Sequence, residues 1–278
     1  MVLAIRLSKW LLPSLEPRNS PLPPHKRTVC CFSSRLSSSL ADQTLMQIET
    51  SGVIACLRAN SAELAIEAAR AALTGGISVL EIVVSTPGVF EVLQQLTNEY
   101  PATTLGVGTV LNVEDARKAA SAGAKFLMSP AMVKDVMDDF QNSDVLYIPG
   151  AMTPTEILSA HYAGAKIIKV YPVSALGGKQ YISALKKPFP HISMVASQGI
   201  TLDSIGEYIA LGATSVVLSD AIFHKEVMSQ SNFKEINHLA HFAALQGNEA
   251  VKRLIFCCKL KGQATEIGTT HISHYFRI

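Results

Sequence analysis

The feature that most constrains the fold is a regular alternation, from Leu45 onward, of short apolar runs with longer amphipathic segments. Runs rich in β-branched residues that alternate with helical patterns predict βαβ units and a parallel sheet. Eight runs fit as strands: Val53–Leu57, Val79–Val84, Thr104–Val107, Phe126–Ser129, Val145–Pro149, Ile167–Tyr171, Ser193–Ala196 and Ser215–Leu218. Eight units within about 180 residues predict a compact α/β fold, the (β/α)8 TIM barrel, with a doubly wound open sheet as the alternative.

The segments between these runs carry helix signals. Ser61 and Asn112 stand at predicted N-caps, and Thr153-Pro154 places a proline in a first helical turn. Four segments end in a glycine phrase directly before a strand: Gly75-Gly76-Ile77, Ala122-Gly123-Ala124, Ala163-Gly164-Ala165 and Leu211-Gly212-Ala213. A repeated closing phrase indicates a repeated structural unit.

The composition fits one barrel-sized domain flanked by tails. The chain has 278 residues, of which 48% are hydrophobic and 17% charged, so it holds enough apolar material for a sizeable core. We expect residues 41–250 to form the barrel and residues 251–278 to be a C-terminal extension with no assigned role. The net charge of +2 gives no basis for nucleic-acid binding.

Residues 1–40 differ in composition from the rest of the chain. They hold six Lys or Arg residues against a single acid, Glu16, and they are rich in Ser and Pro. This composition predicts an organellar transit peptide, with a plastid (chloroplast) favoured over a mitochondrion or the cytoplasm. A disordered basic arm without a targeting role is the alternative. No apolar run approaches the roughly 20 residues of a membrane span, so no membrane partner is expected.

The cysteines and histidines do not form a metal-binding pattern. The cysteines are Cys30, Cys31, Cys56, Cys257 and Cys258, and none of them stands in a CxxC motif. His238 and His241 are neighbours on one predicted helical face, but no third ligand accompanies them. We therefore expect no disulfide framework, no metal and no cofactor.

Two ionisable residues interrupt apolar strands. Lys169 stands within Ile167–Tyr171, and Glu81 stands within Val79–Val84. Burial disfavours the charged form of an amine, and a neutral amine is a nucleophile that forms imines with carbonyl substrates. In a barrel Glu81 is within reach of Lys169 across the interior, so the pair is a candidate imine-forming centre with Glu81 as proton carrier. The alternative is a structural Lys–Glu pair without chemistry.

Further candidate site residues stand at the carboxyl ends of the predicted strands, where barrel enzymes hold their catalytic groups. They are Arg58, Thr109, Pro130, Pro149, Ser197, Gln198, Gly199, Ser219 and Asp220.

Seven motifs, in this order and spacing, resemble the KDPG/KHG aldolase family, the 2-keto-3-deoxy-6-phosphogluconate aldolases of class I. They are LRANS at 57–61, LEI at 80–82, GVGTVLN at 106–112, SPAM at 129–132, YIPGAMTPTE at 147–156, IKVYP at 168–172 and GITLD at 199–203. The resemblance extends from about Gln47 to Gly247 and does not include the tails. It implies a homotrimeric barrel that cleaves a 2-keto-3-deoxy sugar acid, such as KDPG or 4-hydroxy-2-oxoglutarate, to pyruvate and an aldehyde.

The resemblance also implies roles for individual residues. It places the imine-forming lysine of the family on Lys169 and the general acid/base glutamate on Glu81. It implies that Thr109 holds the pyruvate portion and that Arg58 pairs with the substrate carboxylate, which suits the bidentate fork of arginine. Positions that line the same pocket fall on Pro130 and Pro149.

This chain departs from the family pattern at three places. Ser85 stands where many members carry an arginine, which leaves Arg58 as the expected anion contact. The family's phosphate site uses bare glycine backbone after the last two strands, where backbone amides meet the phosphate. Here those turns read Ser197-Gln198-Gly199 and Ser219-Asp220, and a glutamine side chain and a carboxylate both oppose a phosphate dianion. We expect a retained lyase centre with an altered distal pocket.

Two other functional hypotheses stay open at this point. The altered turns favour a non-catalytic or weakly active aldolase-like barrel that binds a small keto acid. An isomerase or epimerase acting on sugar phosphates is the third possibility, and it requires an intact phosphate turn that this chain lacks.

Overall fold

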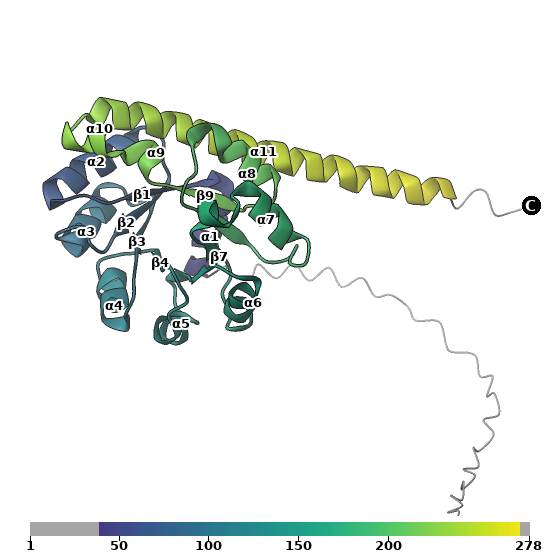
Figure 1. The fold of residues 1–278 in the computed structure, drawn as a ribbon, viewed down its shortest axis with the longest axis horizontal. Coiled ribbons are helices and arrows are strands. Elements are labelled where there is room, and N and C mark those ends of the chain that lie inside the picture. The colour runs from purple at the N-terminus through teal and green to yellow at the C-terminus, as the bar shows by residue number, and fades with distance from the viewer. Residues whose placement is uncertain (1–38, 273–278) are drawn as a thin grey trace, which may run out of the picture. The chain divides into compact units, whose positions relative to one another are not determined.

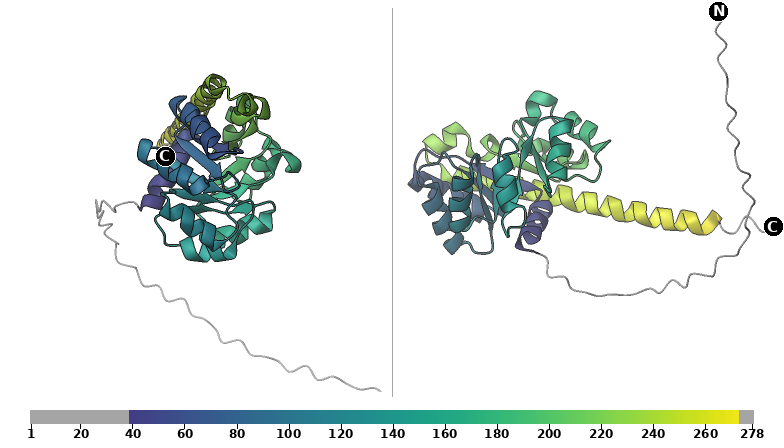
Figure 2. Two further views of the ribbon diagram at one scale, coloured as in Figure 1. Left: turned by 90° about the vertical axis from the view of Figure 1, so that its left-hand side faces the viewer. Right: turned by 90° about the horizontal axis from the view of Figure 1, so that it is seen from below.

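Within residues 39–272, nine short strands form one parallel sheet that closes into a barrel (Figures 1 and 2). The computed structural model describes residues 39–272, with side chains up to residue 256. The strands are β1 (Val53–Leu57), β2 (Val79–Val83), β3 (Thr104–Gly108), β4 (Phe126–Met128), β5 (Leu146–Ile148), β6 (Gly150–Ala151), β7 (Ile168–Val170), β8 (Met194–Ser197) and β9 (Ser215–Leu218). The barrel prediction is confirmed, and the open doubly wound sheet is excluded.

The predicted strand Val145–Pro149 is two strands in the structure. β5 pairs with β4 and β6 pairs with β7, so the single segment from Leu146 to Ala151 joins the two ends of the sheet. Pro149 separates the two strands because proline has no N–H to donate to a strand ladder. Its carbonyl instead accepts the backbone N–H of Lys169 at 2.8 Å. The barrel wall therefore consists of eight chain segments. The fifth of them, Leu146–Ala151, changes its partner strand at Pro149.

Helices follow the strands around the barrel. They are α1 (Leu40–Ser51), α2 (Ala62–Thr74), α3 (Val89–Glu99), α4 (Val113–Ser121), α5 (Lys134–Phe140), α6 (Pro154–Tyr162), α7 (Lys179–Lys186), α8 (Ile205–Ala210), α9 (Asp220–Phe223), α10 (Lys225–Ser229) and α11 (Phe233–Ile272), with 3-10 turns at Val173–Leu176 and Leu202–Ser204. The predicted caps are confirmed: Ser61 and Asn112 cap α2 and α4, and Thr153 forms a capping box with Glu156 at α6.

The repeated glycine phrase closes four helices in the same way. Gly76, Gly123, Gly164 and Gly212 have φ between 97° and 111°, which the absence of a side chain permits. In each unit the next residue donates its N–H to a carbonyl five positions back, as Ile77 does to Ala72 at 3.2 Å. This hydrogen bond is the mark of the Schellman motif, so the repeat identified in the sequence is a repeated chain reversal from helix to strand.

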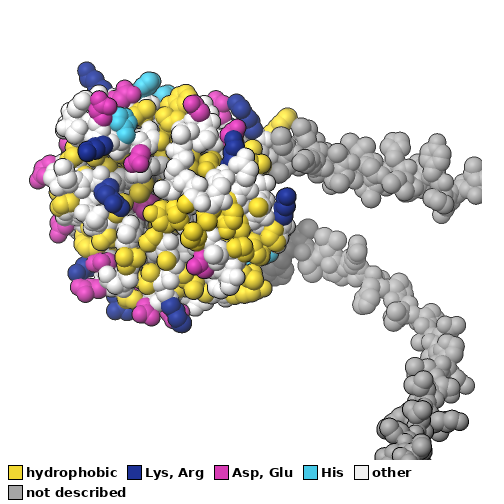
Figure 3. All heavy atoms as spheres, viewed as in Figure 1, with side chains coloured by type: hydrophobic (Ala, Val, Ile, Leu, Met, Phe, Trp, Pro, Cys, Tyr) yellow, Lys and Arg dark blue, Asp and Glu magenta, His cyan; other side chains and the backbone are white. Residues whose placement is uncertain are grey.

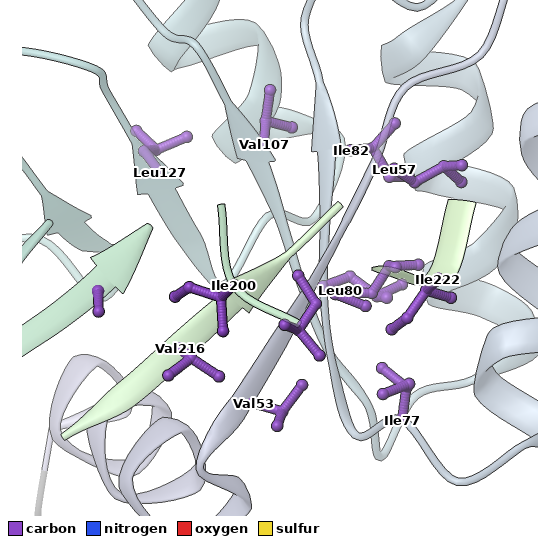
Figure 4. Packing of buried hydrophobic residues seen from close by; sticks show 14 of the residues in the cluster. Val53, Leu57, Ile77, Leu80, Ile82, Val107, Leu127, Ile200, Val216 and Ile222 are labelled. Atoms are coloured by element: carbon purple, nitrogen blue, oxygen red, sulfur yellow. The ribbon is translucent and has the colours of Figure 1, made fainter. Parts of the chain in front are cut away.

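Two apolar layers hold the barrel together. The outer layer lies between the sheet and the helices, and Figure 4 shows part of it, including Leu57, Leu80 and Val216. The inner layer fills the barrel with side chains such as Phe126 and adds Ala41 and Ile48 of α1, so α1 closes the end at which the strands begin. Full burial of each large aliphatic side chain stabilises the fold by about 1.5–3 kcal/mol. The opposite end of the barrel, where the strands finish, holds a cavity.

The structure describes only one of the two predicted tails in any detail. Residues 1–38 of the predicted transit peptide lie outside the described residues. At the other end α11 packs against α2 and α8 and continues without a break across residues 250 and 251 (Figure 1). Over residues 39–272, we find no helix that combines the length and the apolar character needed to cross a membrane.

Candidate active site

A cavity of about 330 Å³ lies at the carboxyl ends of the strands. Ten of the residues singled out in the sequence line it: Arg58, Glu81, Thr109, Pro130, Lys169, Ser197, Gln198, Gly199, Ser219 and Asp220. They come from seven different strands or from the turns that follow them, because parallel strands in a barrel all end at the same rim. Pro149 does not line this cavity, since its ring separates β5 from β6 and its carbonyl is bonded to Lys169.

Lys169 and Glu81 face each other at the bottom of this cavity. The Nζ atom of Lys169 lies 3.8 Å from Oε1 of Glu81, and the two side chains are 8% and 1% exposed. At this distance the two groups attract each other but do not form a hydrogen bond. Among the described residues, neither carboxylate oxygen of Glu81 has a hydrogen-bond partner. A buried carboxylate left in this state costs free energy, and a bound ligand or water with a polar group between Glu81 and Lys169 would offset it.

A glycine in β3, Gly108, makes room for the Glu81 side chain. Glu81 pairs in register with Gly106, and Gly108 lies two residues further along the same face of β3. A methyl group on Gly108 would lie 2.7 Å from Cγ of Glu81 and closer still to its carboxylate. The glycine at position 108 is therefore what allows a glutamate to lie flat against the neighbouring strand.

Tyr171 is a site residue that the sequence analysis did not single out. Its ring lies 5.4 Å from Nζ of Lys169, and it lines the same cavity. The ring face favours a cation at this distance, so Tyr171 interacts with the charged form of the lysine or of an imine. The sequence contained a signal for Tyr171, because Lys169 and Tyr171 are two residues apart in the predicted strand and side chains at that spacing point to the same side.

Cys56 also lines the cavity, next to Lys169 and Glu81 in the barrel interior. Burial raises the pKa of the Cys56 thiol well above its usual range, and the negative charge of Glu81 raises it further. The thiol therefore stays protonated at neutral pH and behaves as a small apolar side chain.

The outer part of the cavity carries unpaired charges. Arg58 and Asp220 are both exposed, and within the described residues neither side chain forms an ion pair or a hydrogen bond. Both also line an adjoining cavity of about 530 Å³ that reaches Asn60 and Lys225. A substrate that enters past Arg58 and Asp220 meets one positive and one negative side chain at the rim.

Gln198 closes another side of the cavity. Its backbone has φ = 86°, a conformation that glycine adopts easily and glutamine rarely. Its side-chain Oε1 accepts a hydrogen bond from the Ser174 hydroxyl at 2.6 Å. This bond ties the turn after β8 to the turn after β7, so the glutamine amide that the sequence analysis expected at this turn lies at the cavity.

The remaining candidates lie away from this cavity. Ser85 is exposed and does not line it. His241 contacts the carbonyl of Gly75 at 3.3 Å, whereas His238 is exposed beside Glu235. Among residues 39–256, no cluster of three His, Cys, Asp or Glu side chains is placed to hold a metal ion.

Comparison with known proteins identifies similar chains. The family model of KDPG and KHG aldolase matches residues 45–239. A 2-dehydro-3-deoxy-phosphogluconate aldolase of Treponema pallidum is 36% identical over 163 residues, which cover 59% of this chain and 78% of that protein. The KHG/KDPG aldolase of Escherichia coli K12 is 26% identical over 196 residues, which cover 70% and 92%. A Legionella pneumophila KDPG aldolase, solved with pyruvate captured as a covalent carbinolamine, is 28% identical with a TM-score of 0.67 over 72% of this chain and 97% of that chain.

Proposed function

The chain belongs to the KDPG and KHG aldolase family, and on that premise we propose that Lys169 is the amine that forms an imine with the substrate. The protein is an aldehyde-lyase, a class I aldolase that cleaves a 2-keto-3-deoxy sugar acid to pyruvate and an aldehyde. The observation that carries the assignment of Lys169 is its burial 3.8 Å from Glu81 within the cavity.

The proposed reaction uses Lys169 as nucleophile and Glu81 as proton carrier. The neutral amine of Lys169 adds to the 2-keto carbon to form a carbinolamine, and loss of water gives an iminium. Glu81 accepts the proton of the C4 hydroxyl, the C3–C4 bond breaks, and the electron pair moves to the iminium as an enamine while the aldehyde leaves. Protonation of the enamine and addition of water release pyruvate and restore Lys169.

Other cavity residues hold the substrate in this scheme. Arg58 pairs with the substrate carboxylate, since it is the unpaired guanidinium of the cavity. The Thr109 hydroxyl donates to the pyruvate portion, and the Tyr171 ring stabilises the iminium charge on Lys169.

Trapping with borohydride tests this assignment. Incubation with pyruvate and borohydride should add a reduced pyruvyl group to the peptide that contains Lys169, and Lys169→Ala should abolish the adduct with the fold intact. Lys187→Ala is the matched control, because Lys187 is an exposed lysine outside the cavity. An unmodified Lys169, under conditions that trap a control aldolase, would refute the assignment. Pyruvate binding without any turnover would support the non-catalytic barrel instead.

The substrate class is further limited by Asp220 and Gln198. Both side chains line the cavity together with Lys169, and they present a negative charge and a neutral amide there. A phosphate on the distal end of the substrate would be repelled by Asp220 without a compensating ion pair. We therefore propose that phosphate recognition is altered and that unphosphorylated 2-keto-3-deoxy acids are turned over at least as well as phosphorylated ones.

Charge removal at Asp220 tests this part of the proposal. Asp220→Asn should raise the kcat/KM ratio of phosphorylated to unphosphorylated substrate by about tenfold, since one like charge a few Å from an anion costs upwards of about 1.4 kcal/mol. The control is Asp203→Asn, which removes the same charge from an exposed site outside the cavity. An unchanged ratio in Asp220→Asn would show that Asp220 does not face the distal end.

The assembly proposed for this chain is a homotrimer. A groove of about 540 Å³ next to the active cavity is lined largely by apolar atoms and includes the exposed Met132 and Met152. Figure 3 shows hydrophobic side chains gathered on one face, in the region of α6 and α7. Such a surface supports an interface between copies. Light scattering should give three times the chain mass, and replacing Met132 and Met152 by aspartate should give monomers.

The location proposed for the protein is the plastid, with the basic and Ser-rich composition of residues 1–40 as support. A fusion of residues 1–40 to a fluorescent protein should enter plastids when expressed in a plastid-containing cell. Uniform fluorescence in the cytoplasm would refute the targeting role.

A further inference from the structure

Thr109 lies in the cavity with a backbone conformation that threonine avoids. Its φ is 61°, in the left-handed region, where a β-branched side chain is strained. Such strain persists only where the surroundings hold the residue in place. A glycine at this position would adopt the same φ without strain, so the conformation of Thr109 must be maintained by the residues around it.

The backbone on both sides of Thr109 is fixed by hydrogen bonds. The carbonyl of Gly108 accepts the N–H of Val84 at 2.9 Å, and the N–H of Val110 donates to the carbonyl of Met128 at 3.1 Å. The carbonyl of Val110 accepts the hydroxyl of Ser129 at 2.5 Å. The two peptide groups that flank Thr109 are thus tied to Val84, which directly follows β2, and to Met128 of β4.

Tyr147 extends this set of bonds. Its hydroxyl donates to Oγ of Ser129 at 3.1 Å and accepts the N–H of Val133 at 3.1 Å. Ser129 has a single hydroxyl proton, which it gives to Val110, so the proton in the Tyr147–Ser129 bond comes from Tyr147. Ser129 is fully buried and Tyr147 is 5% exposed, so water does not compete for these bonds.

The chain from Tyr147 through Ser129 to Val110 joins β5 to the end of β3, and neither Tyr147 nor Ser129 lines the cavity. We propose that Tyr147 and Ser129 are positioning residues that hold Thr109 in its left-handed conformation and so aim its hydroxyl at the substrate. The inference rests on the proposed function, because it takes Thr109 as a substrate contact.

A double-mutant cycle tests the inference. Tyr147→Phe removes the hydroxyl, leaves Ser129 without its donor, and should lower kcat/KM for cleavage about tenfold, mainly through a higher KM. Thr109→Val removes the hydroxyl that is being positioned and keeps the β-branched shape. In the Thr109→Val background Tyr147→Phe should change kcat/KM less than twofold, because no hydroxyl is left to aim. Tyr208→Phe is the control, since Tyr208 is also 5% exposed and lies outside the cavity.

The outcomes separate the inference from the proposed function. Equal losses from Tyr147→Phe in the wild-type and Thr109→Val backgrounds would overturn the positioning role, and so would a loss from Tyr208→Phe as large as that from Tyr147→Phe. Failure of Lys169 to trap pyruvate in the wild type would instead overturn the proposed function. If Tyr147→Phe is too unstable to assay, Ser129→Ala carries the same test, because it releases the Val110 carbonyl directly.

Discussion

Replacement of Gly108 by alanine should disable the active site without changing a catalytic residue. Gly108 lies in β3 with an ordinary extended backbone, so the strand itself accepts alanine. The added methyl group, however, would meet Cγ of Glu81 at 2.7 Å, whereas an ordinary contact begins at 3.4 Å. Cγ must therefore retreat by about 0.7 Å, the difference between these distances, and the carboxylate beyond it must move further.

The size of the effect follows from this displacement. A misplacement of about 1 Å at a reacting group costs on the order of 10²-fold in rate, so we expect kcat for aldol cleavage to fall about 100-fold in Gly108→Ala. Lys169 is not displaced, so pyruvate should still be trapped on Lys169 by borohydride, only more slowly. Steady-state cleavage assays coupled to pyruvate reduction measure the first effect, and mass spectrometry measures the second.

Two variants complete the experiment. Glu81→Asp shortens the side chain by one methylene and should restore part of the activity when combined with Gly108→Ala, although by itself it lowers activity. Gly206→Ala places a methyl group in open space within α8 and should leave kcat unchanged while stabilising the protein by about 0.5–1 kcal/mol. A Gly108→Ala protein that folds normally and keeps kcat within about threefold of wild type would refute the reasoning.

Three further predictions concern stability and reactivity. Burial raises the pKa of Glu49, with the hydrogen bond to Ser193 opposing the shift, so the charged form of Glu49 costs stability at neutral pH. The favourable contribution of Glu49 to the free energy of unfolding is present below its unfolded pKa and is lost as pH rises through the folded pKa. Glu49→Gln should therefore raise Tm at pH 7 and have little effect on Tm near pH 4. The raised pKa of Cys56 predicts slow alkylation by iodoacetamide at pH 8 in the native protein and fast alkylation in urea, measured on the Cys56 peptide. Ser231→Gly should raise the free energy of unfolding by about 0.5–1 kcal/mol, since Ser231 has φ = 49°, and chemical denaturation checks the change.

Much of the fold was accessible from periodicity alone. The eight apolar runs form strands in the structure, and the caps at Ser61 and Asn112 and the closing glycines correspond to local hydrogen bonds. The split at Pro149 was not recognised, because the sequence shows that proline lacks a donor but not that this segment has a different partner on each side. Strand partners are a property of the closed sheet.

Part of the candidate site could also be predicted from the sequence. Lys169 and Glu81 are conspicuous in the sequence because ionisable groups are rare inside apolar strands, and the barrel rule brings the strand ends together at one rim. Tyr171, which directly follows β7, was missed, although its spacing of two residues from Lys169 places both side chains on one side of the chain. The bonds of Tyr147 to Ser129 and Val133 have no sequence signal, since any buried tyrosine finds partners that only folding selects.

The sequence by itself determined that this chain forms repeated βα units and that a lysine and a glutamate lie among apolar strand residues, because propensity, capping and burial act over a few neighbouring residues. Only the tertiary structure decided that Lys169 and Glu81 lie 3.8 Å apart, that Gly108 makes room for Glu81, and that Thr109 is held in a strained conformation. These features depend on distances between strands that are remote in the chain, and those distances are set by closure of the barrel and the packing of its interior.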